Sequence, residues 1–456
     1  PAMRPGEPST SVVAGQAHFR GKLRVTPKSN QISVPQVELN VAAELIRPGD
    51  GVCPPRPLLS ILCVRWFDYW SDPSQSSDYS TLNDGMFMDL FEGPCSMGKR
   101  LPGEYEVFTI FMRSSRDFAR LKPEHLRALL RGRNVAVWYF VWPSSDVFGF
   151  VSEREFFTFC RAMERLPIRN CWPHPTHLYR ILCGKQWIPQ MSLNKSFRVP
   201  PTTRIHYADF RRDGKKAALK ALGALMRLRE SVWGKPPADL DEFRGVVKLG
   251  FSWGGDGVLP FKGVSNMVRN LKDLFEHHRN ENVVCLVQEM VPGVVGEHRV
   301  LCMWDKARGN FWKEPLWMLC NKPAGGAFRV DEFRMASSSV VPSFDVASKF
   351  FRGDREAQKD AEEEAQRVVD RWLKWFKTES PEPPQTTRID FMVSHPSPGQ
   401  AEIWTCEVGE CGASLCTVEV HGRNTASLNS VVIRDDKGRF PMRFPEVLPR
   451  NTGWKS

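Results

Sequence analysis

The pattern of hydrophobic and polar positions divides the chain into two structured halves. In the first half, core material begins at Leu58 (LLSILCVRWF), a strand-like segment covers 106–112, and an apolar run follows at 134–142 (NVAVWYFVW). The segment 122–132 (KPEHLRALLRG) has helical spacing and ends at a glycine. Strands that alternate with a helix at this spacing predict a parallel α/β domain.

The second half alternates amphipathic helices with strands and tight glycine turns. A basic helix is predicted over 214–229 (GKKAALKALGALMRLR), and a longer one over 354–377 begins acidic and ends in aromatic residues. The proline-rich segment 381–385 should stop the second helix. The apolar side chains of the basic helix should face a core: Leu219, Leu222, Leu225 and Met226.

The two ends of the chain show little periodicity. We therefore expect residues 1–55 to form an extended N-terminal arm and residues 426–456 to form a C-terminal tail. Between them, the α/β domain should cover 56–175, and the second half should cover 176–425.

Composition is ordinary for a soluble globular protein, with 41% hydrophobic and 25% charged residues. These values exclude a disordered chain and a collagen-like fibre. No apolar run approaches the roughly 18 residues that are needed to span a bilayer. The 63 basic and 52 acidic residues leave a net charge of +11, which favours anionic ligands such as nucleotides.

The 12 cysteines contain no Cys-x-x-Cys pair, which argues against a zinc ribbon or a thioredoxin-like site. Several lie in apolar strings, as Cys285 does in VVCLVQEM, and these predict buried free thiols. We therefore expect a reducing intracellular compartment, either the cytoplasm or an organelle. Residue 1 is proline, so we expect that the true start has been removed or omitted, and an organelle location would follow from loss of a targeting segment.

A glycine-rich loop follows a strand that ends in a lysine. The segment VVKLGFSWGGDGV carries Lys248 and then Gly250, Gly254, Gly255 and Gly257. Such a loop lets backbone N–H groups approach phosphate oxygens, while the lysine supplies positive charge. The alternative is a plain hairpin with a glycine turn, because the segment does not match the Walker pattern.

Two acids flank a short Pro-Gly loop in CLVQEMVPGVVGEHRVLCM. Glu289 ends one apolar strand, and Glu297 opens the next, so the two could bracket a purine and its ribose. The alternative makes both of them solvated residues at strand ends. His298 is expected to be a structural neighbour and no ligand.

Asp390 and Glu407 are predicted to lie side by side across a hairpin. Asp390 sits in the apolar strand TRIDFMV, and a turn at 396–399 returns a second strand that carries Glu407. Two carboxylates this close repel each other unless a cation lies between them, and Mg²⁺ with bound phosphate suits such a pair. Glu410 could add a third oxygen ligand. The alternative, two acids on an exposed face, is disfavoured by the apolar neighbours.

The order of these segments resembles the ATP-grasp superfamily. Lys185, in LYRILCGKQWIPQM, lies between a helix-like and a strand-like tract and matches the lysine before the family's small lobe. Lys248 with its glycines matches the phosphate loop of that lobe. The resemblance covers roughly residues 170–425 and implies a small lobe over 176–290 and a large lobe over 291–425.

The resemblance also implies roles for individual residues. The adenine hinge would comprise Gln288, Glu289 and Val291, and Glu297 would be the ribose acid. Arg299, with Arg388, would face the transferred phosphate, and Asp390, Glu407 and Glu410 would hold Mg²⁺. The implied reaction uses ATP to convert a small-molecule or peptide carboxylate into an acyl phosphate, which an amine or a thiol then attacks.

One departure from the family pattern leaves a second function open. The family commonly has Asn two residues after the metal-binding Glu, whereas this chain has Gly409. The alternative is therefore a degenerate ATP-grasp protein that acts as a nucleotide-binding or structural subunit, with protein partners contacted through the N-terminal arm. Nucleic-acid binding through the basic helix is disfavoured, because its lysines and arginines are more simply a solvated face.

Overall fold

A computed structural model gives the fold of the chain. It describes residues 32–34, 37–39, 41–44, 59–66, 105–112, 126, 135–140, 153–166, 170–172, 176–183, 185, 187–250, 257–277, 283–305, 308–318, 340–341, 343–384 and 386–410. The tail expected at 426–456, most of the arm expected at 1–55, and the helix expected at 122–132, apart from Leu126, lie outside these residues.

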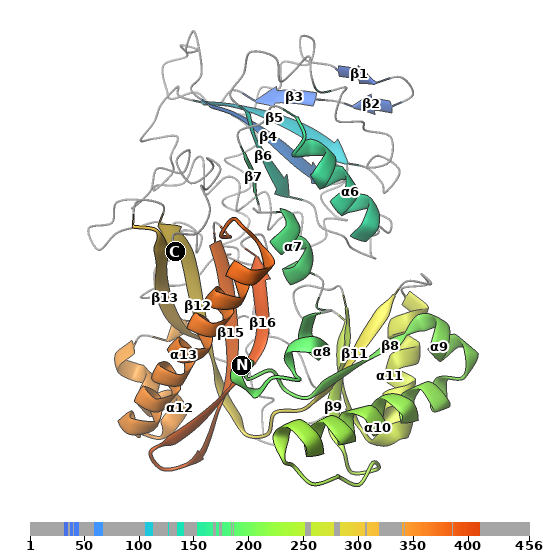
Figure 1. Ribbon diagram of the computed structural model, residues 1–456, viewed down its shortest axis with the longest axis vertical. Coiled ribbons are helices and arrows are strands. Elements are labelled where there is room, and N and C mark those ends of the chain that lie inside the picture. Colours follow the sequence, from blue (N-terminus) through green and yellow to red (C-terminus); the bar gives the residue numbers. More distant parts are fainter. Residues whose placement is uncertain are drawn as a thin grey trace, which may run out of the picture.

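The N-terminal part contains the predicted parallel sheet (Figure 1). Its strands are ordered β3-β5-β4-β6-β7; β4 to β7 run parallel, and β3 pairs antiparallel with β5. Strand β3 lies within the segment expected to be an arm. The bounds are β3 Val41–Glu44, β4 Leu59–Trp66, β5 Tyr105–Met112, β6 Val135–Phe140, α6 Glu153–Met163 and β7 Asn170–Trp172, while β1 Ile32–Val34 and β2 Val37–Leu39 form a separate pair.

A four-stranded antiparallel sheet, ordered β10-β9-β11-β8, forms the small lobe together with three helices. Alternate strand residues such as Val247, Leu249 and Val287 join Leu222 and Leu271 of the helices in one buried cluster. The opposite face of the sheet carries Lys248 and Gln288. The bounds are β8 Thr202–His206, α9 Tyr207–Arg212, α10 Gly214–Trp233, β9 Arg244–Leu249, β10 Val258–Lys262, α11 Gly263–His277 and β11 Val284–Glu289.

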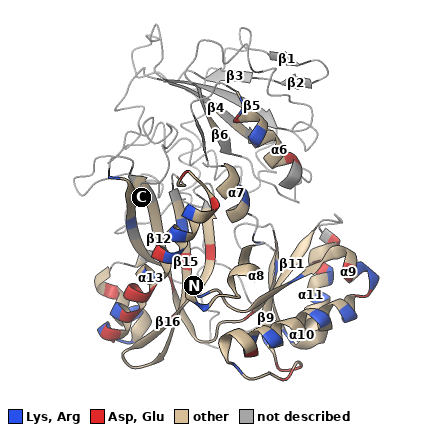
Figure 2. Ribbon diagram, viewed as in Figure 1, with Lys and Arg blue, Asp and Glu red and all other residues tan. Residues whose placement is uncertain are grey.

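Helix α10 confirms the predicted basic helix and corrects one of its positions. Leu222 and Leu225 are buried, whereas Leu219 is 39% exposed. Leu219 follows buried Ala218 by one residue, about 100° around the helix, so it leaves the inward stripe. Figure 2 shows Lys and Arg distributed along α9 and α10, where they form the expected solvated face.

A five-stranded antiparallel sheet, ordered β14-β13-β12-β15-β16, forms the large lobe. Helix α13 packs along β15 and β16, and α12 packs near its start. The Asp354 side chain caps α13 by accepting a hydrogen bond from the Ala357 N–H at 2.9 Å. The bounds are β12 Val294–Asp305, β13 Asn310–Met318, β14 Val340–Val341, η4 Ser343–Asp345, α12 Val346–Phe351, α13 Arg355–Glu379, β15 Thr386–Ser397 and β16 Gln400–Glu410.

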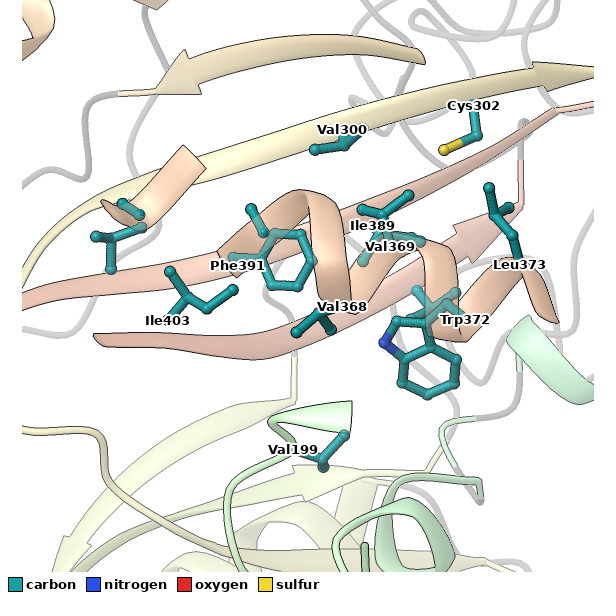
Figure 3. Close-up of a cluster of buried hydrophobic side chains, with 14 of the residues drawn as sticks. Val199, Val300, Cys302, Val368, Val369, Trp372, Leu373, Ile389, Phe391 and Ile403 are labelled. Atoms are coloured by element: carbon teal, nitrogen blue, oxygen red, sulfur yellow. The ribbon is translucent and has the colours of Figure 1, made fainter. Parts of the chain in front are cut away.

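The core of the large lobe lies between α13 and the sheet (Figure 3). Trp372 of α13 is fully buried, and its ring lies 5.0 Å from Trp187 and 4.6 Å from Phe197. Both partners belong to the segment before the small lobe, namely α7 Thr176–Cys183, α8 Trp187–Met191 and η3 Lys195–Phe197. The tract after Lys185 is therefore helical, where the sequence pattern indicated a strand. These connecting helices pack into the large lobe's core.

Within the described ranges, Cys160, Cys285 and Cys302 are buried free thiols, as predicted, and Cys406 is a partly exposed one. Across the same ranges, no helix has the length and apolarity that a bilayer crossing requires.

His298 is a buried histidine on the core side of β12. It is 1% exposed, its ring lies 4.5 Å from Trp317, and its Nδ1 atom has no hydrogen-bond partner among the residues that the structure describes. Burial lowers the pKa of His298 to about 4, although a backbone hydrogen bond with Leu316 opposes the shift. The structure therefore supports the expected structural role.

This burial predicts a pH-dependent loss of stability. The folded-state pKa of about 4 lies below the unfolded value of 6.5, so the unfolded chain binds the proton more readily. The stabilising contribution is complete above pH 6.5 and is lost as pH falls from 6.5 toward 4. By pH 5 the loss should reach about 2 kcal/mol.

Urea unfolding at pH 7 and pH 5 measures this loss. The His298→Phe variant should lose about 2 kcal/mol less than the wild type between the two pH values. Replacement of the exposed His206 with glutamine should leave the wild-type difference intact. Equal pH dependence in the wild type and His298→Phe would show that His298 does not contribute.

Candidate functional site

The large sheet presents two neighbouring rows of side chains on the face opposite its core, and the first of them is charged. Cross-strand pairing places Arg299 of β12 beside Asp390 of β15, and Asp390 beside Glu407 of β16. A second row runs from Glu297 through Met392 to Trp404. Because side chains alternate along a strand, the intervening residues point into the core. The predicted pairing of Asp390 with Glu407 across the hairpin is thereby confirmed.

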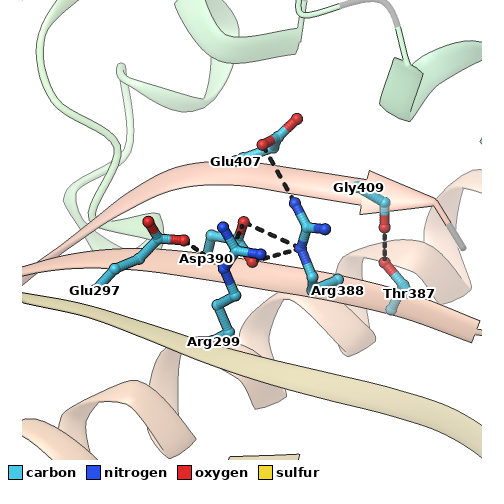
Figure 4. Close-up of polar contacts among 7 residues, drawn as sticks. All are labelled: Glu297, Arg299, Thr387, Arg388, Asp390, Glu407 and Gly409. Carbon is cyan, nitrogen blue, oxygen red and sulfur yellow. Dashed lines mark hydrogen bonds and ion pairs between the residues drawn. The ribbon is translucent and has the colours of Figure 1, made fainter. Parts of the chain in front are cut away.

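A guanidinium group bridges the two paired carboxylates (Figure 4). Arg388 Nε donates to both carboxylate oxygens of Asp390, at 2.8 and 3.0 Å, and Nη2 lies 3.4 Å from Glu407 Oε2. The Arg388 and Asp390 side chains are only 3% and 1% exposed. Burial alone would lower the pKa of Arg388, but the charges of Asp390 and Glu407 raise it above its ordinary value. Arginine thus supplies the cation that two neighbouring carboxylates require.

Arg299 extends the same ion network along the sheet. Its Nε atom lies 2.5 Å from Glu297 Oε1 and 3.6 Å from Asp390 Oδ2. Burial raises the pKa of Glu297, and the charge of Arg299 opposes that shift. We call Glu297, Arg299, Arg388, Asp390 and Glu407 the ion network.

The described side chains partly fit a magnesium ion. Within the described part of the chain, no three His, Cys, Asp or Glu side chains converge as a metal site. Asp390 and Glu407 do form a directly opposed carboxylate pair, and Mg²⁺ commonly binds one or two carboxylates together with phosphate oxygens and water. Glu410 ends β16 opposite Thr387, and its side chain lies outside the described residues.

The small lobe contributes lysines to the same region. Lys248 Nζ donates to Gln288 Oε1 at 2.7 Å. Burial lowers the pKa of Lys248; Cys406 and Glu407 of the large lobe oppose this, and Lys185 reinforces it. The Lys185 N–H also donates to the Gly250 carbonyl at 2.8 Å, at the start of the glycine loop. The structure therefore brings both predicted lysines toward β16.

The ends of the glycine loop leave little space for side chains. A Cβ atom at Gly250 would lie 2.9 Å from the Val284 carbonyl oxygen. Gly257 has a φ of +66°, and its Cβ atom would lie 2.6 Å from Leu249 Cδ1. Both positions therefore require glycine. Gly254 and Gly255 lie outside the described residues.

The Glu289 carboxylate is paired within the small lobe. It accepts from Arg229 Nε at 3.0 Å and from Lys235 Nζ at 3.2 Å, and its side chain is 11% exposed. The Lys235 ammonium also lies 4.9 Å from the Trp404 ring of the large lobe. Val291 follows β11 in the loop to β12 and is partly buried. The structure thus ties the predicted hinge strand to both lobes.

Sequence patterns gave no indication of three residues in this region. Cys406 is an extra residue at a β-bulge, beside Glu407. Thr202 of β8 accepts from Gln288 Nε2 at 2.9 Å, and Trp404 packs 4.9 Å from Trp233. The Thr202 and Trp404 contacts each join elements that are far apart in the chain. Local sequence patterns do not show which distant segments come into contact, so they could not indicate these residues.

The chain is similar in structure to several solved enzymes. Its TM-score to D-alanyl-alanine synthetase A from Vibrio cholerae O1 biovar eltor is 0.48, at 12% identity over 86% of this chain and 97% of that chain. Its TM-score to the D-alanine–D-alanine ligase from Bacillus anthracis complexed with ATP is 0.47, at 12% identity over 86% of this chain and 96% of that chain. Its TM-score to D-cycloserine synthetase DcsG is 0.43, at 16% identity over 78% of this chain and 93% of that chain.

No family model and no curated protein matches the chain. The described elements, two antiparallel sheets with helices that follow a parallel sheet, agree with the arrangement that the resemblance to the ATP-grasp superfamily implies. At TM-scores below 0.5 and identities of 16% or less, these similarities carry no functional argument. We therefore base the functional proposal on contacts within the chain.

Proposed function

We propose that this chain is an ATP- and Mg²⁺-dependent ligase that converts a carboxylate into an acyl phosphate and transfers the acyl group to an amine or a thiol. The main observation in support is that the ion network of the large lobe lies opposite Lys248 of the small lobe. In this proposal, the two guanidinium groups and the ammonium group would lie around the phosphoryl group that is transferred. Such fixed charges stabilise a developing anion without reorganising at the moment of reaction.

The proposed roles are those that the resemblance to the ATP-grasp superfamily implies. Lys185 and Lys248 would hold the phosphates, and Glu297 would accept from the ribose hydroxyls. Arg299 and Arg388 would stabilise the anion that develops during transfer. When bound, Mg²⁺ would neutralise phosphate charge, held by Asp390 and Glu407 and supported by Glu410. The glycine loop would close over the phosphates and exclude water from the acyl phosphate.

A second candidate function is a nucleotide-binding or structural subunit with an inactive site. The observation that favours it is the internal pairing of the ion network, in which Arg388 already neutralises Asp390. Gly409, which has no side chain, occupies the place of the family's asparagine, and its carbonyl accepts from Thr387 Oγ1 at 2.9 Å. Release of ADP from ATP in the presence of candidate carboxylates and amines distinguishes the two functions. An active ligase sustains ADP release over many turnovers only when both substrates are present, because the acyl phosphate formed from the carboxylate needs an acceptor before the next cycle.

Replacement of Lys248 with alanine should weaken ATP binding about 10-fold, because one charged hydrogen-bond donor to phosphate is lost. Calorimetric titration of Mg²⁺-ATP into the variant and the wild type measures this change. Lys262→Ala is a matched control, since Lys262 ends the neighbouring strand β10, is exposed and pairs with Glu242. Unchanged affinity in Lys248→Ala would contradict the assignment of this lysine to phosphate binding.

A further inference from the structure

A continuous series of hydrogen bonds links Lys248 through Gln288 and Thr202 to the Pro200 carbonyl. Lys248 Nζ donates to Gln288 Oε1 at 2.7 Å, and Gln288 Nε2 donates to Thr202 Oγ1 at 2.9 Å. Thr202 Oγ1 in turn donates to the Pro200 carbonyl at 2.7 Å. Gln288 and Thr202 are each only 2% exposed, and they are direct cross-strand partners in β11 and β8.

The direction of every hydrogen bond in this series is fixed by chemistry. An ammonium group can only donate, so the oxygen of the Gln288 amide must face Lys248. The amide nitrogen must then face Thr202, whose hydroxyl oxygen accepts. The hydroxyl proton is left for the Pro200 carbonyl, which can only accept. Each polar atom in the series therefore has a partner, and glutamine fits both of its neighbours.

The backbone around Gln288 is held closely in place. A Cβ atom at Gly245 of the neighbouring strand β9 would lie 2.7 Å from the Gln288 carbonyl oxygen. The next residue, Glu289, donates its N–H to the Pro201 carbonyl at 2.9 Å. The amide group that receives Lys248 is therefore attached to a fixed part of β11.

An amide holds an ammonium group without cancelling its charge. A carboxylate in the same place would form an ion pair with Lys248 and reduce its attraction for phosphate. An apolar side chain would leave the ammonium group without this acceptor. We propose that Gln288 is a positioning residue that fixes the Lys248 ammonium group between the lobes and leaves its positive charge available to the phosphates of the nucleotide.

This inference rests on the proposed function for its phosphate ligand and gives Gln288 a role other than contact with the base. The hydrogen bonds are independent of any nucleotide. Two readouts therefore separate the two ideas: the rate at which Lys248 reacts, and the affinity for ATP.

The first readout is acetylation of the full chain by acetic anhydride at pH 8, with Lys248 and Lys262 quantified in the same sample by peptide mass spectrometry. Only the neutral amine reacts. In Gln288→Glu, the ion pair should retain the proton and slow the Lys248 reaction at least ~10-fold relative to Lys262. In Gln288→Leu, loss of the acceptor should speed the reaction about 3-fold. Gln366→Glu, at an exposed position of α13, should change neither rate.

Opposite changes in the two variants are the expected signature, because general loosening of the fold would speed acetylation in both. Equal or same-direction changes would overturn the proposal.

The second readout, titration with Mg²⁺-ATP, should show about 10-fold weaker binding in Gln288→Glu. If the rates change in opposite directions but the wild type binds no ATP, the proposed function fails and the fixing of Lys248 stands. If ATP binds and the rates do not respond, the proposed function stands and the role of Gln288 fails.

Discussion

Replacement of Arg388 with alanine should lower the free energy of unfolding by about 3–5 kcal/mol, because the buried Asp390 carboxylate loses the group that hydrogen-bonds both of its oxygens. Asp390 is 1% exposed, and both of its oxygens accept from Arg388. Water cannot readily replace the guanidinium group at such a site. Urea unfolding of the full chain, followed by circular dichroism, measures the change.

Two further variants identify the cause of this loss. Arg388→Ala combined with Asp390→Asn should regain part of the stability, since the buried charge is then absent. Arg212→Ala, which removes an exposed pair with Asp209, should cost less than about 1 kcal/mol. If Arg388→Ala were as stable as the wild type, the ion network would have no structural importance.

The second large effect concerns metal dependence. In Asp390→Asn, the factor by which Mg²⁺ tightens ATP binding should fall about 100-fold, because one proposed metal ligand is lost. Calorimetric titrations of ATP with Mg²⁺ and with EDTA give this factor for each chain. Asp370→Asn is the matched control, since Asp370 lies on α13 and is 58% exposed.

The wild-type titration also separates the two candidate functions. Tight binding that loses its metal dependence only in Asp390→Asn supports a ligase site and justifies a screen of carboxylates and amines. If wild type and Asp390→Asn respond equally to Mg²⁺, the metal role of Asp390 is wrong. Absence of ATP binding in the wild type would favour the structural subunit.

Local sequence patterns predicted much of the fold. Apolar, strand-like runs gave the parallel strands β4, β5 and β6, and helical spacing gave α10 and α13 close to their observed bounds. The pairing of Asp390 with Glu407 was predictable because a short turn joins their strands, so the hairpin largely determines which residues meet. The position of Leu219 was wrong because an apolar residue beside the inward stripe has no strong signal of its own.

The side-chain contacts of the site could be predicted less well from the sequence. A cation between Asp390 and Glu407 was expected on electrostatic grounds, but Arg388, two residues before Asp390, supplies one within the protein. The pairing of Glu289 with Arg229, 60 residues earlier, depends on how α10 packs on the sheet. Sequence spacing can indicate that charged residues share a strand face, whereas the partner that each one chooses depends on tertiary packing.

The alternation of side chains in β15 restricts how the length of this strand can vary during evolution. Arg388 and Asp390 lie on one face of the sheet, and Ile389 and Phe391 are fully buried on the other. A single-residue deletion before Arg388 would shift the register and drive two charged groups into the core against α13. Homologous chains that keep this site should therefore accept insertions and deletions at the tip of the β15–β16 hairpin, around Gly399, while the number of residues in β15 stays constant.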